Sequence, residues 1–374
     1  MKISDVTVKR FAERIDGKDV PNGREVQTVT VHTDEGVTGM GYVSLRSAGI
    51  GPSGDIHAAF LRRNLKHLVV GENPLLTERV WQRMYTPASK LGRRGLVLNC
   101  ISAIDCALWD IKGKLVNAPV SDLLGGRRER IPTYANNAQH LPPDKLAQKA
   151  LEYVGMGHTA LKIRGNAMYV SLKEATDRVI AVREAVGPDV KLMVDVNGTW
   201  DADTAIQQLQ AWEPYDVYWL EEPVPPEDVA GYVNVRARSG DTYVVGGEQH
   251  AGVHEFRQLI EQGAVDIVQP DANVTGGITD WMKIYNLATA FNVVVSPHAL
   301  QWIHIHMAAA LPNVKWIEYF MADNELFDFQ VKLFKGPRIR EVRQDDGVFL
   351  LPPESPGLGL ELDDAEAERC LIDE

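Results

Sequence analysis

In the first third of the chain, hydrophobic and polar positions alternate in short runs and then recur at helical spacing. The segments VTVKRF (6–11) and EVQTVTVHT (25–33) alternate apolar and polar residues, which is typical of half-buried strands. DEGVTGMGYVSL continues as a turn and a strand, and we interpret the glycines of GVTGMG as turn residues. In NCISAIDCALWDIKGKL (99–115), apolar residues recur every three or four positions, which predicts a helix. Gly125-Gly126 then breaks the chain, so we expect an α+β domain over residues 1–125.

After this break, short runs rich in Val, Ile and Tyr alternate with amphipathic helical stretches. The runs are IPTYANN, ALKIRGN, KLMVDVNG, VYWLEEP, YVVGGEQ, AVDIVQPD, NVVVSPH and KWIEYF. Strand–helix alternation predicts a parallel sheet, and nearly eight repeats predict a closed β/α barrel over residues 126–330. An open doubly wound sheet is the competing α/β architecture. A Gly-rich phosphate loop after the first strand would favour it, and the sequence has none there. Residues 331–374 are rich in Pro and Gly, which predicts an irregular segment returning to the first domain.

Nearly every predicted barrel strand ends in polar or ionisable residues after an apolar run. These residues are Lys162, Arg164, Asp195, Asn197, Glu221, Glu222, Glu248, Asp271, His298 and Glu318. In a β/α barrel the carboxyl ends of the strands converge on one mouth, where active sites lie. We therefore expect these side chains to face one another.

Three carboxylates at the ends of successive strands predict a metal site. Asp195, Glu221 and Glu248 would repel one another at the barrel mouth unless a cation lies between them. Oxygen ligands without a nearby Cys favour Mg²⁺ over Zn²⁺ or Cu²⁺, and Mn²⁺ is a further option. The alternative is that each carboxylate caps the helix that follows it, but this alternative weakens when all three are considered together.

Asp271 and His298 end neighbouring strands, where a carboxylate would fix the tautomer of the imidazole and raise its basicity. This pair predicts a general base. Lys162 and Arg164 alternate along one strand and so share a face, which in a barrel is the interior. His304 and His306 resemble a metal-binding HxH pair, but residues two apart on a helix do not face each other, so we expect core or surface positions. Trp302 is a candidate for closing the mouth over a substrate.

Composition narrows the function classes. The length of 374 residues fits a barrel with an added domain, and the net charge of −12 argues against a nucleic-acid binder. Three cysteines without CxxC spacing suggest a reducing compartment. The start of the chain lacks the apolar region of a signal peptide, and no apolar run approaches the length of a membrane span. We expect a cytoplasmic protein without a membrane or nucleic-acid partner.

The motifs ALKIR, LMVDVNG, WLEEP, GGEQ, IVQPD, VSPH and IEYF together resemble the mandelate racemase-like subgroup of the enolase superfamily. The resemblance covers nearly the whole chain. It implies a modified TIM barrel, (β/α)7β, with an N-terminal α+β capping domain that the C-terminal segment completes. It further implies that Asp195, Glu221 and Glu248 hold Mg²⁺ and that His298 and Asp271 form an acid/base dyad. Glu318 would then be a protonated group that hydrogen-bonds the substrate carboxylate, and Lys162 would lie near that carboxylate.

The chain departs from the resembled pattern at Arg164, where the family has a second lysine that serves as the base on the opposite face. Arginine keeps its proton at neutral pH, so it is a poor base. One-sided chemistry is therefore easier: His298 would take the α-proton of a sugar-acid carboxylate and then protonate the leaving β-hydroxyl. We expect an acid-sugar dehydratase that gives a 2-keto-3-deoxy acid. A racemase, an epimerase or a lactone cycloisomerase on the same site is the alternative, and a metal-binding barrel without catalysis is a third.

The expected substrate is a sugar acid or diacid that chelates the metal through its carboxylate and α-hydroxyl. Cap loops around residues 14–25 and 44–55 are rich in Gly, Asp, Arg and Ser, and we expect them to set specificity. Asn197, Arg46 and Trp302 are the candidate substrate-binding residues. Barrels with such caps commonly form symmetric assemblies, so a homo-oligomer is expected.

Overall fold

A computed structural model describes most of the chain. The described residues are 1–15, 18–19, 24–45, 53–126, 128–137, 141–166, 168, 170–321, 323–324, 328–336 and 340–373. Arg46 and parts of both cap loops that were expected to set specificity lie outside these residues.

The N-terminal domain is an antiparallel sheet covered by helices. Its first strands are β1 (Ile3–Ala12), β4 (Glu25–Thr33) and β5 (Thr38–Leu45), and a short pair joins β2 (Arg14–Ile15) to β3 (Lys18–Asp19). The helices are α1 (Gly54–Phe60), a π-helical turn (Leu61–Leu65), α2 (Lys66–Val69), α3 (Thr77–Ala88), α4 (Leu96–Val116) and α5 (Val120–Leu123). The buried faces of the sheet and of α4 share one hydrophobic core. The predicted α+β character of this domain is confirmed.

Two glycines were interpreted incorrectly from the sequence. Gly39 and Gly41 lie within strand β5, whereas Gly36, with a φ of 82°, occupies the turn before it. A Cβ atom at Gly39 or Gly41 would collide with a backbone carbonyl of α4. These two glycines therefore allow helix and strand to approach closely, and only Gly36 is needed for the turn.

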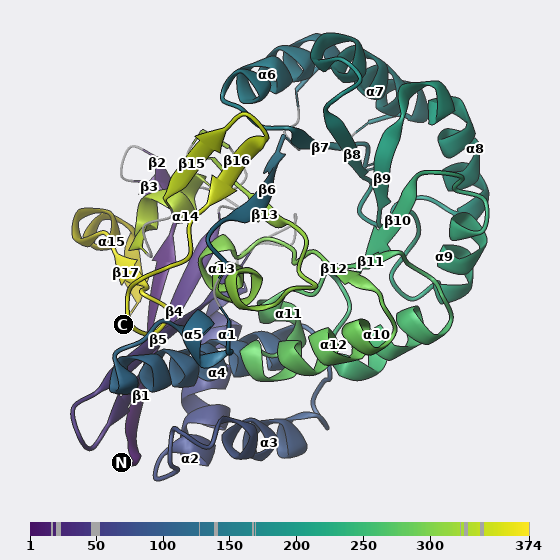
Figure 1. Ribbon diagram of the computed structural model, residues 1–374. Coiled ribbons are helices and arrows are strands. Elements are labelled where there is room, and N and C mark those ends of the chain that lie inside the picture. Colours follow the sequence, from purple (N-terminus) through teal and green to yellow (C-terminus); the bar gives the residue numbers. More distant parts are fainter. Residues whose placement is uncertain are drawn as a thin grey trace.

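The second domain is a ring of eight parallel strands with helices outside it (Figure 1). The strands are β6 (Ile131–Asn136), β7 (Ala160–Arg164), β8 (Lys191–Asp195), β9 (Val217–Glu221), β10 (Tyr243–Gly246), β11 (Ile267–Val268), β12 (Val294–Val295) and β13 (Ile317–Tyr319). The helices between them are α6 (Pro143–Gly155), α7 (Leu172–Val186), α8 (Ala202–Trp212), α9 (Val229–Arg236), α10 (Gly252–Glu261), α12 (Ile278–Ala290) and α13 (Gln301–Ala310). Two single turns, a 3-10 helix (Glu213–Tyr215) and α11 (Ala272–Thr275), complete the domain.

The ring closes because its last strand pairs with its first. β13 runs parallel to β6, with Glu318 opposite Tyr134, and a bridge from Val295 to Val314 joins β12 to the segment before β13. Eight strands with seven intervening helices form the expected (β/α)7β barrel, so the predicted fold is confirmed. All carboxyl ends of these strands open at one mouth.

The C-terminal segment is more regular than the sequence suggested. It contains α14 (Asp328–Leu333), β14 (Phe334–Gly336), β15 (Glu341–Gln344), β16 (Gly347–Leu350), β17 (Glu361–Leu362), α15 (Asp364–Cys370) and β18 (Leu371–Asp373). β16 pairs antiparallel with barrel strand β6, and β18 pairs antiparallel with β1. The prediction of an irregular segment is therefore wrong, although its end does complete the cap sheet. No helix in the described part of the chain combines the length and hydropathy that a membrane crossing requires.

Candidate active site

Three carboxylates meet at the barrel mouth. Asp195 ends β8, Glu221 ends β9, and Glu248 follows β10 by two residues. One carboxylate oxygen of each lies within 4.8 Å of the other two. Asp195 and Glu221 also face each other in the β8–β9 register. The predicted convergence of these three side chains is therefore seen in the structure.

This triad has the chemistry of a site for a hard divalent cation. Glu221 is fully buried, and its Oε2 atom has no hydrogen-bond partner among the described residues. Burial, together with the charges of Asp195 and Glu248 and against the opposing charge of Lys162, raises the pKa of Glu221 to about 8. A divalent cation would satisfy the free oxygen and relieve the repulsion among the three carboxylates.

Asn197 holds one of these carboxylates in place. Its backbone N–H donates to Asp195 Oδ1 at 2.9 Å, and its side-chain amide donates to Asp195 Oδ2 at 3.1 Å. The amide oxygen of Asn197 accepts from Asn166 at 3.0 Å. A left-handed φ of 48° at Asn197, tolerated by Asn better than by most residues, allows both bonds to Asp195. The arrangement uses the Asn197 amide to orient Asp195.

Lys162 is enclosed by carboxylates on the other side of the triad. Its Nζ lies 2.6 Å from Glu221 Oε1 and 2.7 Å from Glu318 Oε1, and only 1% of the side chain is exposed. Burial opposes the charged form, but Glu221 and Glu318 outweigh it and hold the pKa of Lys162 well above its ordinary value. Lys162 is therefore a fixed cation in the barrel interior.

Glu318 is held in its ionised form. It accepts from the side-chain amide of Asn136 at 2.6 Å and from the backbone N–H of Ala299 at 2.8 Å, in addition to the contact with Lys162. Burial alone would raise its pKa, but Lys162, His298 and the hydrogen bond from Ala299 lower the pKa of Glu318 to about 2. An ionised carboxylate accepts hydrogen bonds and cannot donate one. Glu318 is therefore an acceptor in this arrangement, and the protonated form expected for it beside a substrate carboxylate stays a prediction.

Arg164 points to the same interior as Lys162. Its guanidinium Nη2 lies 3.5 Å from Asp195 Oδ2, and its Nε is buried without a hydrogen-bond partner among the described residues. The predicted shared face of the two β7 cations therefore agrees with their contacts. Arg164 supplies positive charge beside Asp195, and as an arginine it keeps its proton.

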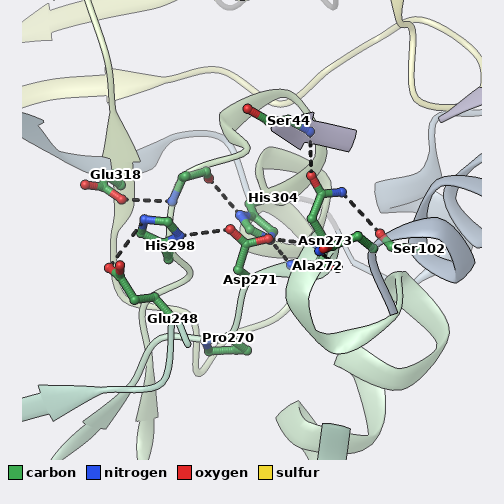
Figure 2. Close-up of polar contacts among 12 residues, drawn as sticks. Ser44, Ser102, Glu248, Pro270, Asp271, Ala272, Asn273, His298, His304 and Glu318 are labelled. Carbon is green, nitrogen blue, oxygen red and sulfur yellow. Dashed lines mark hydrogen bonds and ion pairs between the residues drawn. The ribbon is translucent and has the colours of Figure 1, made fainter. Parts of the chain in front are cut away.

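His298 and Asp271 form a hydrogen-bonded pair at the barrel mouth. His298 Nδ1 donates to Asp271 Oδ2 at 2.8 Å, and His298 Nε2 lies 3.3 Å from Glu248 Oε2 (Figure 2). Burial opposes the charged ring, but Glu248, Asp271 and Glu318 raise the pKa of His298 to about 9. Because Asp271 accepts the hydrogen bond from Nδ1–H, Nε2 is the nitrogen that can transfer a proton.

Asp271 is itself anchored to the N-terminal domain. It caps α11, and its Oδ1 accepts from the backbone N–H of Asn273 at 2.7 Å. The Asn273 side chain accepts from Ser44 N at 3.2 Å and donates to Tyr42 O at 2.9 Å and to Ser102 Oγ at 3.2 Å. Figure 2 shows this chain of contacts from His298 through Asp271 and Asn273 to Ser44 and Ser102. The cap therefore holds the turn that carries Asp271.

Trp302 is buried, and its indole ring lies 5.6 Å from the ring of Phe334 in the C-terminal segment. Packing against Phe334 is enough to explain why the indole of Trp302 is buried. The expected role of Trp302 in closing the mouth over a substrate stays a prediction. The same holds for Arg46, whose position is not described.

Two polar residues of the site, Asn136 and Glu222, were not assigned a role from the sequence. Asn136 ends β6 as Asp195 ends β8, so its position at a strand end was an available signal. Glu222 was noted only as a polar strand end; it is fully buried, and burial with the charges of Glu248 and Asp195 raises its pKa well above the ordinary value. His304 and His306 are both fully buried, which excludes the surface option for them.

Comparisons with known proteins agree with this geometry. Residues 21–125 match the mandelate racemase/muconate lactonizing enzyme N-terminal domain, and residues 145–367 match the enolase C-terminal domain-like family. A 3,6-anhydro-alpha-L-galactonate cycloisomerase of Streptomyces coelicolor is 32% identical over 295 residues, which are 79% of this chain and 80% of that protein. An L-talarate/galactarate dehydratase of Salmonella typhimurium is 33% identical over 310 residues, 82% of this chain and 75% of that protein.

A solved structure extends the likeness to the whole fold. The crystal structure of L-talarate dehydratase from Polaromonas sp. JS666, complexed with Mg and L-glucarate, matches with a TM-score of 0.85 at 28% sequence identity. The match covers 100% of this chain and 99% of that one. Both domains and the full barrel thus have counterparts among these relatives, and the chain belongs to the mandelate racemase/muconate lactonizing enzyme family of the enolase superfamily.

Proposed function

We propose that this protein is a Mg²⁺-dependent sugar-acid dehydratase, a hydro-lyase that converts its substrate into a 2-keto-3-deoxy acid. The relatives named above include a dehydratase of sugar diacids, and one solved relative contains both Mg and L-glucarate. Asp195, Glu221 and Glu248 would hold the ion, with Mn²⁺ as a substitute. When bound, the ion would supply positive charge for the substrate carboxylate as the α-proton leaves.

One argument carries the proposal: of the basic residues that the structure places at the mouth, His298 is the one suited to act as the base. His298 has a carboxylate partner on Nδ1, and its Nε2 would become available for proton transfer when a bound metal ion takes Glu248, which lies 3.3 Å away. Lys162 has a pKa well above its ordinary value, and arginine is a poor general base. A racemase needs a group that accepts and a group that donates a proton on opposite faces of one carbon. This site favours chemistry on one face.

The proton can therefore travel on that face alone. His298 Nε2 takes the α-proton, and the electrons of the broken C–H bond move into the carboxylate. The same nitrogen then gives its proton to the β-hydroxyl, so the C–O bond breaks and water leaves. The resulting enol tautomerises to the keto acid. General-base catalysis alone supplies about 10²–10⁴-fold, so the fixed cations Lys162 and Arg164 must contribute a large share by stabilising the developing charge.

The residues around the dyad take supporting roles in this proposal. Glu318 and Asn136 hold Lys162 toward the substrate carboxylate, and Asn197 fixes Asp195. Trp302 and Arg46 stay candidates for substrate contact. The substrate is a sugar acid or diacid whose carboxylate and α-hydroxyl point to the metal ligands.

A lactone cycloisomerase is the second candidate, because a curated cycloisomerase resembles the chain as closely as the dehydratase does. This reaction also needs only one strong base, so the argument from His298 does not separate the two. The products do: dehydration removes water and creates a keto group, whereas isomerisation keeps the mass.

A screen in D₂O tests the proposal. The protein with Mg²⁺ would be incubated with mono- and diacid sugars, beginning with galactarate and L-glucarate, and the products analysed by mass and by a 2-keto acid assay. We expect a 2-keto-3-deoxy product, and a loss of about 10²–10⁴-fold in its rate for His298→Asn. Products of unchanged mass apart from deuterium uptake would identify an isomerase instead. Turnover that His298→Asn leaves intact would exclude this mechanism.

Other aspects of the assignment belong to the same proposal. We propose domains of residues 1–125 and 126–330 with a returning segment of 331–374, a homo-oligomeric assembly and a cytoplasmic location. Size-exclusion chromatography with light scattering tests the assembly, since each chain has a mass of 41.5 kDa.

A further inference from the structure

We propose that His304 is a positioning residue for the His298–Asp271 dyad, acting as a neutral imidazole clamp between the two turns that carry these residues. The proposal rests on the function above in treating His298 as the base, but the clamp itself is a matter of geometry. His304 lies in the first turns of α13 and has no exposed surface.

Each ring nitrogen of His304 contacts the peptide next to one member of the dyad. Nε2 accepts from the backbone N–H of Ala272, the residue after Asp271, at 3.1 Å. Nδ1 lies 2.8 Å from the carbonyl oxygen of Ala299, the residue after His298. One ring therefore contacts both turns, and Figure 2 draws His304 next to Asp271.

These two partners fix the protonation of the ring. A backbone N–H can only donate, so Nε2 must accept, and a carbonyl can only accept, so Nδ1 must carry the hydrogen. A doubly protonated ring would lose the bond to Ala272. Burial lowers the pKa of His304 to about 4, in agreement with a neutral ring. Only the Nδ1–H tautomer serves both contacts.

The turn after His298 needs such support because its backbone is strained. Ala299 and Leu300 have φ values of 48° and 41°, in the left-handed region that non-glycine residues avoid. Each such residue costs roughly 1–2 kcal/mol, so surrounding contacts must hold the turn. His304 binds the carbonyl oxygen of Ala299, and Glu318 accepts from the backbone N–H of Ala299 at 2.8 Å. Loss of the His304 contact would allow the turn to relax and to move His298 relative to Asp271.

The same helix provides a matched control. His306 is also fully buried, and burial likewise lowers its pKa to about 4. It too sits between a donor and an acceptor, Ser121 N at 3.4 Å and Leu358 O at 3.2 Å. Neither partner adjoins the dyad. A general effect of removing a buried imidazole from α13 should therefore be equal at the two positions.

The experiment compares His304→Leu, His304→Gln and His306→Leu in the full-length protein. Histidine side chains labelled with ¹⁵N report tautomer and environment by NMR without any substrate. In the parent we expect His304 as the Nδ1–H tautomer, and in His304→Leu a changed ring signal for His298. We expect His306→Leu to leave the His298 signal unchanged. Gln keeps an acceptor and a donor, so it should restore the signal in part.

Turnover gives the second readout, with the acid found in the screen. A small displacement of a reacting group costs about 10²-fold, so His304→Leu should lower kcat by about that factor with little change in KM. His306→Leu should keep kcat near the parent value. An Nε2–H tautomer of His304 in the parent protein would overturn the proposal, and this measurement does not depend on whether any variant folds. Equal His298 signals in His304→Leu and His306→Leu would also overturn it. Failure of every acid in the screen would count against the proposed function but not against the clamp.

Discussion

Proton occupancy is the feature of individual residues that most affects this site. Burial and neighbouring carboxylates raise the pKa of Glu221 to about 8, and carboxylate partners raise the pKa of His298 to about 9 against the effect of burial. Without a cation, both groups therefore hold protons at pH 7. A carboxylate must lose its proton to bind a metal, so metal binding and proton release are coupled.

We therefore expect Mg²⁺ to displace protons from the metal-free protein at pH 7. Glu221 should release roughly one proton per ion, and His298 should release a further fraction because the ion takes its partner Glu248. The pKa values of Glu221 and His298 are about 8 and 9, so above these pH values both groups have lost their protons before Mg²⁺ binds. The proton release caused by Mg²⁺ should therefore fall to almost none as the pH rises. Adding MgCl₂ to dialysed protein in weak buffer with a pH indicator measures this.

Two controls accompany that titration. Glu221→Gln has no carboxyl proton at this position, so it should release fewer protons, and NaCl at equal ionic strength should release almost none. If the parent protein bound Mg²⁺ at pH 7 without releasing protons, the raised pKa of Glu221 would be contradicted.

Among the secondary-structure elements, the single-turn helix α11 of the barrel makes hydrogen bonds to the cap domain. Asp271 caps it on the barrel side, and the Asn273 side chain binds β5 and α4 of the cap. Further along, Asp105 of α4 accepts from Thr279 N at 2.9 Å and from Thr279 Oγ1 at 2.6 Å at the start of α12. Cap docking and the position of Asp271 therefore depend on the same short segment.

Replacing Asn273 should weaken the docking of the cap on the barrel. Asn273→Ala removes three hydrogen bonds and leaves Ser44 N and Tyr42 O without them. Each buried group left unpaired costs about 1–3 kcal/mol, so the free energy of unfolding should fall by roughly 3 kcal/mol or more. Asn99→Ala, which removes one bond to Asn273 O, should cost less. Urea unfolding of both variants measures the difference, and equal losses would show that the Asn273 side chain does not anchor the cap.

At the scale of the whole molecule, the barrel could be predicted because the same sequence pattern repeats along the chain. Each apolar run followed by a charged residue marks a strand and its carboxyl end, so Asp195, Glu221 and Lys162 could be placed at one mouth from their order alone. The contacts of His304 could not be predicted from the sequence, because its partners are backbone atoms of two alanines, whose side chains give no sign of them. The ionised state of Glu318 was also hidden, since it depends on three donors from separate segments.

The C-terminal strands could not be predicted for a related reason. β16 and β18 have four and three residues, too few for a clear alternation. They exist because each pairs with a strand far away in the sequence: β16 with β6, and β18 with β1. Regular structure in this segment thus results from tertiary pairing, which local pattern does not encode.

The end of the chain protects an edge of the cap sheet, so removing it should weaken that domain. β18 covers β1, whose other neighbour is β4, and Asp373 lies 2.8 Å from Arg62. Deleting residues 371–374 would expose the backbone N–H and C=O groups of β1 around Arg10 and Phe11 as a template for pairing with other chains. We expect a stability loss of about 1–3 kcal/mol in urea and more self-association by light scattering. Asp373→Asn weakens the ion pairs of Asp373 with Arg62 and Arg10, worth about 0–1 kcal/mol each at a partly exposed site, but it keeps β18 on β1, so this variant should not associate. A truncated protein as stable and as monodisperse as Asp373→Asn would mean that β18 does not protect the sheet.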